Sequence, residues 1–169
     1  MEFKTLYQDL VNSTEMIQAL TNGIGQEQDQ VKPGRGSWSI LEVICHLYDE
    51  EREDFREHLD FILHRQDEKW KNIAPQAWVK LRKYNQQDFK KMKVKFFDER
   101  KKSLTWLKTL KNADWNKTYI TKWGKFTAAQ MFASWVAHDN LLIRQLTELR
   151  RARIENISKP LSIKYAGDW

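Results

Sequence analysis

The sequence has little of what would cross-link the chain or break it into many short elements. Its 169 residues include six glycines, three prolines and a single cysteine, Cys45. So few turn-forming residues argue against a many-stranded β protein. One cysteine excludes an intrachain disulfide, which agrees with a reducing compartment. No apolar run approaches the roughly 20 residues of a membrane span, and no signal-peptide core is present. We therefore expect a soluble, cytoplasmic protein with no membrane partner.

An excess of one charge sign is also missing from any single region. The chain has 29 basic and 23 acidic residues, a net charge of +6, and the two signs are interspersed. The basic clusters at 90–93, 100–102 and 150–153 fall within helical patterns, which is typical of a solvated helix face. No zinc-finger or RNA-recognition motif accompanies them, so nucleic-acid binding is not favoured. His58 and His64 follow a dense run of charges, and we expect both at the surface.

What the chain does have is long amphipathic segments. Apolar residues recur at three- and four-residue steps, the period of a helix with one buried face. The predicted helices cover residues 3–22, about 39–62, 87–110 and 127–154. Four such helices with connections that can return the chain predict an all-α, up-and-down-type four-helix bundle, as a single domain over residues 1–169.

Local signals set the ends of these helices. Ser39 with Glu42, and Thr127 with Gln130, have the spacing of capping boxes, in which side chain and backbone bond reciprocally at a helix start. Pro75 suits the first turn of a short extra helix over 75–84. Residues 118–126, TYITKWGKF, are β-like in composition and predict a short arm or hairpin before the last helix.

Two histidines lie on the flanks of the apolar faces of different predicted helices. His46 has Glu50 one turn later on the same flank, and His138 lies between Trp135 and Leu142. Facing helices of a bundle can hold metal ligands rigidly. Two ligands do not define a site, however, so periodicity alone favours hydrogen bonding at a helix interface.

Two further residues allow more than one interpretation. Asp139 falls within the apolar arc of the last helix, where a carboxylate needs a partner or a raised pKa. A structural partner such as Trp38, a tyrosine or an arginine is favoured over the role of catalytic base. Cys45 adjoins His46, but neighbours on a helix point about 100° apart, which favours a structural cysteine over a Cys–His nucleophile.

Two segments resemble the DinB/YfiT-like family. WSILEVICHLYDEE, residues 38–51, is similar to its second helix, where a Trp precedes a His-Leu-x-Asp-x-Glu-like run. KFTAAQMFASWVAHDNLLIRQLTELR, residues 125–150, is similar to its last helix, where a Thr-started helix carries His-x-x-x-His followed by Gln. The order and spacing of the two motifs and the four-helix pattern extend the resemblance over nearly the whole chain.

The resemblance implies a bundle in which three histidines hold zinc or nickel, with open positions for water or a thiol. Relatives include thiol-dependent transferases and isomerases that use bacillithiol, mycothiol or glutathione. Because relatives often pair, the resemblance also implies a homodimer for this chain. His46 matches the first ligand and His138 the second, but the third position holds Leu142, which cannot coordinate a metal. We therefore expect a degenerate site that binds zinc or nickel weakly or not at all.

Two replacements for the missing ligand can be considered. Glu50 could supply an oxygen and complete a two-histidine, one-carboxylate set. Asp49, or a residue of the segment 118–125, could reach into the site instead. The family pattern supports neither, and the plainer interpretation of Glu50 is a solvated carboxylate on a charged helix face.

The sequence thus predicts a pocket beside the two histidines, lined by Trp38, Glu50, Trp135, Asp139 and Leu142. The leading hypothesis is a metal-dependent thiol transferase or hydrolase-type protein with a degenerate three-histidine site, acting on a small molecule or low-molecular-weight thiol. The alternative is a non-catalytic bundle that acts by small-molecule binding or dimerisation.

Overall fold

The computed structural model describes residues 2–25, 28–122 and 124–167. Helices dominate the structure, with one small antiparallel sheet. In chain order the elements are α1 (Phe3–Thr21), α2 (Ile40–Glu50), the π-helical turn η1 (Glu51–Phe55), α3 (Arg56–His64), α4 (Pro75–Leu81), the 3-10 turn η2 (Tyr84–Gln86), α5 (Phe89–Thr109), β1 (Thr118–Thr121), β2 (Gly124–Thr127), α6 (Ala128–Ile157) and the 3-10 turn η3 (Lys164–Ala166).

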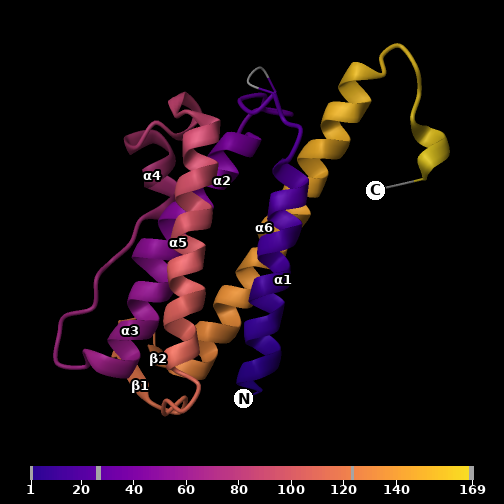
Figure 1. Ribbon diagram of the computed structural model, residues 1–169. Helices are drawn as coiled ribbons and strands as arrows, with labels where there is room; N and C mark the ends of the chain where they lie inside the picture. Colours follow the sequence, from indigo (N-terminus) through magenta and orange to yellow (C-terminus); the bar gives the residue numbers. More distant parts are fainter. Residues whose placement is uncertain (1, 26–27, 123, 168–169) are drawn as a thin grey trace.

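Four long helices form the bundle, because α2, η1 and α3 follow one another without a break. α1 packs on α5 and α6, while α2 packs on α5 and α6 from the other side. Figure 1 shows α1 and α6 running in one direction and α2–α3 and α5 in the opposite one. The connection 65–88, which carries α4, returns the chain between the two parallel helices. The all-α four-helix bundle expected from the sequence is confirmed. Its helix order departs from a strict up-and-down arrangement, because the long connection 65–88 makes α2–α3 and α5 parallel.

Both capping boxes form as the sequence predicts. The Ser39 hydroxyl accepts from the Glu42 amide at 3.2 Å, and the Glu42 carboxylate accepts from the Ser39 amide at 2.9 Å. Thr127 and Gln130 make the same reciprocal pair at the start of α6. The predicted arm is the hairpin β1–β2, and the extra helix is α4, with Pro75 in its first turn.

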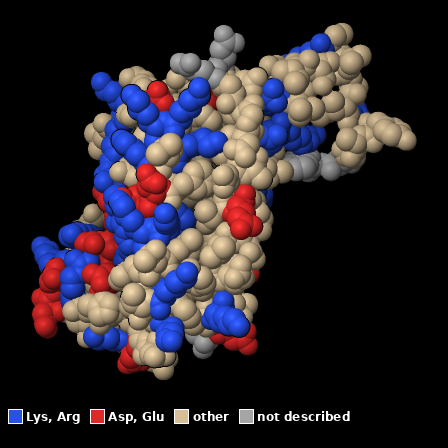
Figure 2. Space-filling view, viewed as in Figure 1, with Lys and Arg blue, Asp and Glu red and all other residues tan. Residues whose placement is uncertain are grey.

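Charged side chains are spread over the surface in separate groups. On the face drawn in Figure 2, acidic side chains are mixed with basic ones at the lower left, and uncharged surface separates other basic groups. None of the helices in the described ranges has both the length and the hydropathy needed to cross a membrane.

One residue predicted to be solvated is instead at the centre of the core. Arg100 of α5 is only 1% exposed. Its guanidinium donates to Glu51 at 2.9 and 2.8 Å and to the two oxygens of Asp139 at 2.6 and 3.0 Å. It also donates to the Thr14 hydroxyl at 3.2 Å and the Leu10 carbonyl at 3.5 Å, both in α1. One side chain therefore connects all four long helices.

The sequence contained a signal for this burial. Arg100 lies four residues after Phe96 and seven before Leu107, on the apolar stripe of α5. The exposed neighbours Lys101 and Lys102 made the cluster look like a solvated face. Burial is tolerable because two carboxylates compensate the buried cation.

We expect Arg100→Ala to lower the free energy of unfolding by about 3–5 kcal/mol, because it leaves two carboxylates buried without their cation. Urea unfolding followed by circular dichroism measures the change. Lys101→Ala, which truncates the exposed neighbour, should stay within about 0.5 kcal/mol of wild type. Equal stability of the two variants would contradict the structural role of Arg100.

Candidate metal centre

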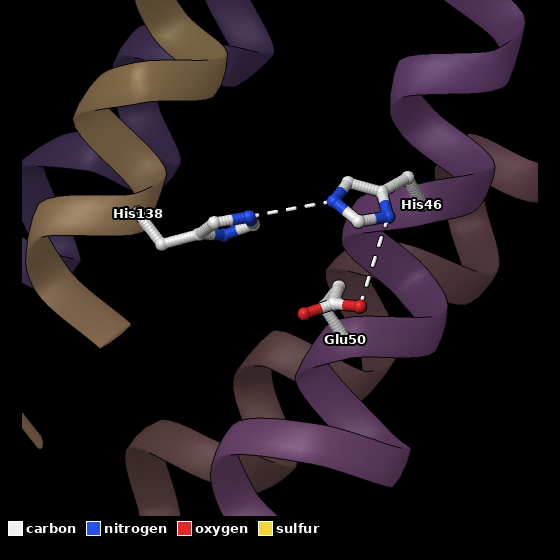
Figure 3. Close-up of side chains that lie close together, drawn as sticks. All are labelled: His46, Glu50 and His138. Atoms are coloured by element: carbon white, nitrogen blue, oxygen red, sulfur yellow. Dashed lines mark hydrogen bonds and ion pairs between the residues drawn. The ribbon is translucent and has the colours of Figure 1, made fainter. Parts of the chain in front are cut away.

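The bundle brings the two predicted histidines together across the interface of α2 and α6. Their Nε2 atoms lie 3.3 Å apart, within hydrogen-bond distance, as helical periodicity alone predicted for this interface (Figure 3). The His46 side chain is 7% exposed, and His138 is half-buried, so the pair reaches solvent from the α6 side. Asp139, the residue after His138, is bound by Arg100, and Arg100 also binds Glu51, the residue after α2. These bonds therefore fix the position of this part of α6 relative to α2.

Aromatic rings form the walls around the pair. The Trp38 ring stands edge-on to His46, with ring centroids 4.8 Å apart, and Phe55 lies 5.1 Å from His138. Burial lowers the pKa of His46 to about 3, and the neighbouring His138 adds to this shift. Burial also lowers the pKa of His138. Both rings are therefore neutral near pH 7 and keep a lone pair for a proton or a cation.

Glu50 is buried beside the histidines, which corrects the expectation of a solvated carboxylate. It is 4% exposed, and its Oε1 lies 3.8 Å from Nδ1 of His46. That distance is too long for a hydrogen bond, and neither atom has a hydrogen-bond partner within the described ranges. Burial raises the pKa of Glu50 to about 9, helped by a hydrogen bond shared with Asp54 and by the negative charges of Asp54 and Asp49.

The residues present fit a divalent metal ion in two respects. A tetrahedral zinc with Zn–N bonds of standard length holds two nitrogens about 3.3 Å apart, which is the separation found between His46 and His138. One ligand atom from each of His46, Glu50 and His138 also lies within 4.8 Å of the other two, and no other such cluster occurs in the described residues. Leu142, at the position of the expected third histidine, is 6% exposed and part of the apolar core.

Of the other predicted pocket residues, one lies beside the histidine pair and two lie in the buried ion-pair network around Arg100. Trp38 adjoins the histidine pair, as described above. Asp139 has both oxygens bound by Arg100, an arginine being one of the structural partners expected from the sequence. The indole Nε1 of Trp135 donates to Glu51 at 3.2 Å. Trp135 and Asp139 therefore belong to the buried ion-pair network and not to the histidine pair.

Cys45 has a structural environment. Its side chain is buried, and its Sγ donates to the Tyr84 carbonyl at 3.7 Å. Burial, together with the negative charges of Asp49 and Glu42, raises the thiol pKa to about 12. The group is therefore a thiol and not a reactive thiolate near neutral pH.

His58, expected at the surface, is 2% exposed. Its Nδ1 lies 2.6 Å from Asp54 and its Nε2 2.9 Å from the Lys71 carbonyl, while its ring stacks on Trp70 with centroids 4.0 Å apart. The loop after α3 covers it, and that loop could not be placed from helical periodicity. His64 is exposed as expected.

A groove adjoins the centre through Trp38. It has a volume of about 620 Å³ and lies between the loop 33–38, α4 and α6, with Gln76, Gln145 and Glu148 among its polar lining residues. A larger hollow of about 960 Å³ runs between α1 and α5. Neither hollow is lined by a histidine or a cysteine, but the groove includes Trp38, whose ring packs on His46. The groove beside Trp38 is therefore the better candidate for a substrate surface.

Comparison with known proteins identifies the class. The model of the DinB superfamily matches residues 9–146, so the chain belongs to this superfamily, as its two motifs predicted. Among solved structures it is similar to YfiT from Bacillus subtilis, described as "a probable metal-dependent hydrolase with an unusual four-helix bundle topology". The TM-score is 0.77 at 16% identity, over 89% of this chain and 86% of that chain, a likeness of fold. No curated protein matches the sequence.

We expect the free energy of unfolding of metal-free protein to fall as the pH rises from about 7 to about 8.5. The folded protein keeps the Glu50 proton up to a pKa of about 9, whereas the unfolded chain releases it near 4.5. Unfolding therefore releases the Glu50 proton throughout this window. His46 and His138 are neutral in the folded state but partly protonated in the unfolded chain near pH 7, so they oppose the slope there and have little effect on it above about pH 7.5. Urea titrations at stepped pH measure the dependence.

Glu50→Gln cannot ionise, so its unfolding free energy should depend less on pH than that of wild type. Glu57→Gln, which removes a partly exposed carboxylate from α3, is the matched control and should keep the wild-type slope. Identical slopes for wild type and Glu50→Gln would show that Glu50 is already ionised in the folded protein.

Proposed function

We propose that the chain is a metal-dependent enzyme of the hydrolase or thiol-transferase type, working through a zinc or nickel ion held by His46 and His138. The observation that carries the proposal is the 3.3 Å separation of their Nε2 atoms. Both rings are neutral near pH 7 because burial lowers the pKa of each, so neither needs to lose a proton to bind a cation. A bound ion of this kind lowers the pKa of a water or thiol on it and supplies a nucleophile.

Two lines of support favour different reactions within this class. The fold shared with YfiT, described as a probable metal-dependent hydrolase, supports hydrolysis. The resemblance of the His46 and His138 motifs to thiol-dependent relatives supports transfer to or from a small thiol. With Leu142 in place of a histidine, we expect this chain to hold the ion less tightly than a three-histidine site does.

The surroundings suit a small polar substrate. His138 is half-buried and reaches solvent, so water or a thiol has access to the pair. The groove beside Trp38 offers amide and carboxylate side chains from Gln76, Gln145 and Glu148. Such groups bind polar ligands by hydrogen bonds, while the rings of Trp38 and Phe55 provide apolar contact surface beside the two histidines.

Wild-type protein equilibrated with zinc or nickel and then dialysed should retain about one ion per chain. Elemental analysis by inductively coupled plasma mass spectrometry measures the content. His46→Ala and His138→Ala should each weaken binding by more than about 100-fold, since loss of a ligand costs more than loss of an outer partner. His64→Ala is the control, because the His64 side chain is 48% exposed on α3.

Folded wild-type protein that retains neither ion would contradict the proposal and favour the non-catalytic bundle.

The reaction type is tested on metal-loaded protein, which is assayed with an activated ester, and separately with reduced glutathione and an activated aryl chloride. Hydrolysis of the first or conjugation in the second decides between the two reaction types. Loss of the active reaction in His138→Ala, but not in His64→Ala, assigns it to this centre.

A further inference from the structure

Asp49 and Glu51, the acidic residues on either side of Glu50, both form ion pairs and hydrogen bonds with residues other than the two histidines. Asp49 accepts from the Tyr84 hydroxyl at 2.5 Å and pairs with Arg82 at 2.7 Å. These bonds tie α2 to the segment around η2, and they exclude Asp49 as the residue that reaches toward the histidines.

Glu51, which directly follows Glu50, is bound by Arg100 at 2.8 Å and by the Trp135 indole at 3.2 Å. Glu50 stands between these two acids, and the described part of the chain gives it no lysine or arginine partner. A carboxylate that is 4% exposed and lacks a cation is costly to keep in a protein interior. The described part of the chain gives the carboxyl group a hydrogen bond shared with Asp54, but it leaves Oε1 without a hydrogen-bond partner.

The unpartnered atoms face the histidine pair. Figure 3 shows the Glu50 carboxylate directed at His46 from the same helix, with His138 entering from α6. Oε1 of Glu50 and Nδ1 of His46 are buried atoms without a hydrogen bond, 3.8 Å apart. The ligands of one divalent ion lie about 3 to 3.5 Å apart. The 3.8 Å contact of Glu50 is to Nδ1 of His46, whereas Nε2 is the atom that faces His138, and an imidazole gives only one nitrogen to one ion. To share an ion with the two Nε2 atoms, a carboxylate oxygen of Glu50 has to move toward them from the 4.8 Å limit of the cluster, and its Oε1 has no hydrogen bond that opposes this movement.

We propose that Glu50 is the third protein ligand, so that the chain has a His46–Glu50–His138 centre in place of a three-histidine one. This inference rests on the proposed function, because it concerns the same ion. The lost position 142 lies on α6, whereas the replacement comes from α2, one turn after His46. Two histidines and one carboxylate form a set known to bind zinc and other divalent first-row ions, with open positions left for substrate.

The carboxylate also changes the charge of the centre. Three neutral imidazoles leave the full +2 of the ion uncompensated, whereas Glu50 halves it in a buried setting. The ion in turn is the cationic partner that buried Glu50 lacks. Asp54, one turn further on, is held by His58 and remains an outer partner of Glu50.

The test measures dissociation constants for Zn²⁺ and Co²⁺ in wild type, Glu50→Gln, Leu142→His and the double variant Glu50→Gln/Leu142→His. Glu50→Gln should weaken binding by more than about 100-fold, beyond the 10–100-fold typical of an outer-sphere partner. The double variant should regain most of that loss, because a histidine at 142 fills the vacated ligand position. Glu57→Gln is the matched control and should bind like wild type.

Each outcome bears on the assignment. Glu50→Gln that binds within about 100-fold of wild type overturns it while leaving the proposed function standing. A larger loss without recovery in the double variant also overturns it, because Glu50 then only orients His46. Wild type that binds no ion ends both proposals.

If the double variant does not fold, the absorption spectra of Co²⁺-loaded wild type and Co²⁺-loaded Glu50→Gln still test the assignment, because this comparison does not need the double variant. The bands of wild type and Glu50→Gln should differ, because one oxygen donor is lost. Unchanged bands in folded Glu50→Gln would overturn the assignment.

Discussion

A single buried guanidinium sets the arrangement on which the candidate centre depends. Arg100 reaches from α5 to Glu51 in η1, to Asp139 in α6 and to Thr14 in α1. Since Asp139 adjoins His138, the ion pair that fixes α6 in the bundle also fixes the second histidine relative to the first. A buried ion pair contributes little net stability, but breaking it leaves charges uncompensated. Its main effect here is to select one arrangement of the helices.

The same helix that carries His46 distributes a run of acids among different surroundings. Asp49 faces Arg82, Glu51 faces Arg100, and Glu50 remains beside the histidine pair. A π-helical turn begins directly after Glu50 and adds one residue to the turn, a feature frequent at functional sites. Because successive side chains of a helix point in different directions, adjacent residues of like charge acquire different chemical roles.

Membership in the DinB superfamily establishes the fold of this chain but not the chemistry of its centre, because function depends on the site residues. Leu142 packs into the apolar core and offers no ligand. Much of the fold could nevertheless be predicted from the sequence, since helix periodicity and the two capping boxes depend on residues three or four apart. The predicted bundle, extra helix and hairpin all appear in the structure.

The sequence by itself determined the four amphipathic helices, their capped starts, and the presence of His46 and His138 on inward flanks. Only the tertiary structure decided which charged groups are buried: Arg100 and His58, predicted at the surface, lie inside, and Glu50 lies beside the histidines. The physical reason is that a helix period reports which face is apolar, whereas the burial of a charge depends on a partner. Those partners come from other helices or a distant loop, and only folding brings them together.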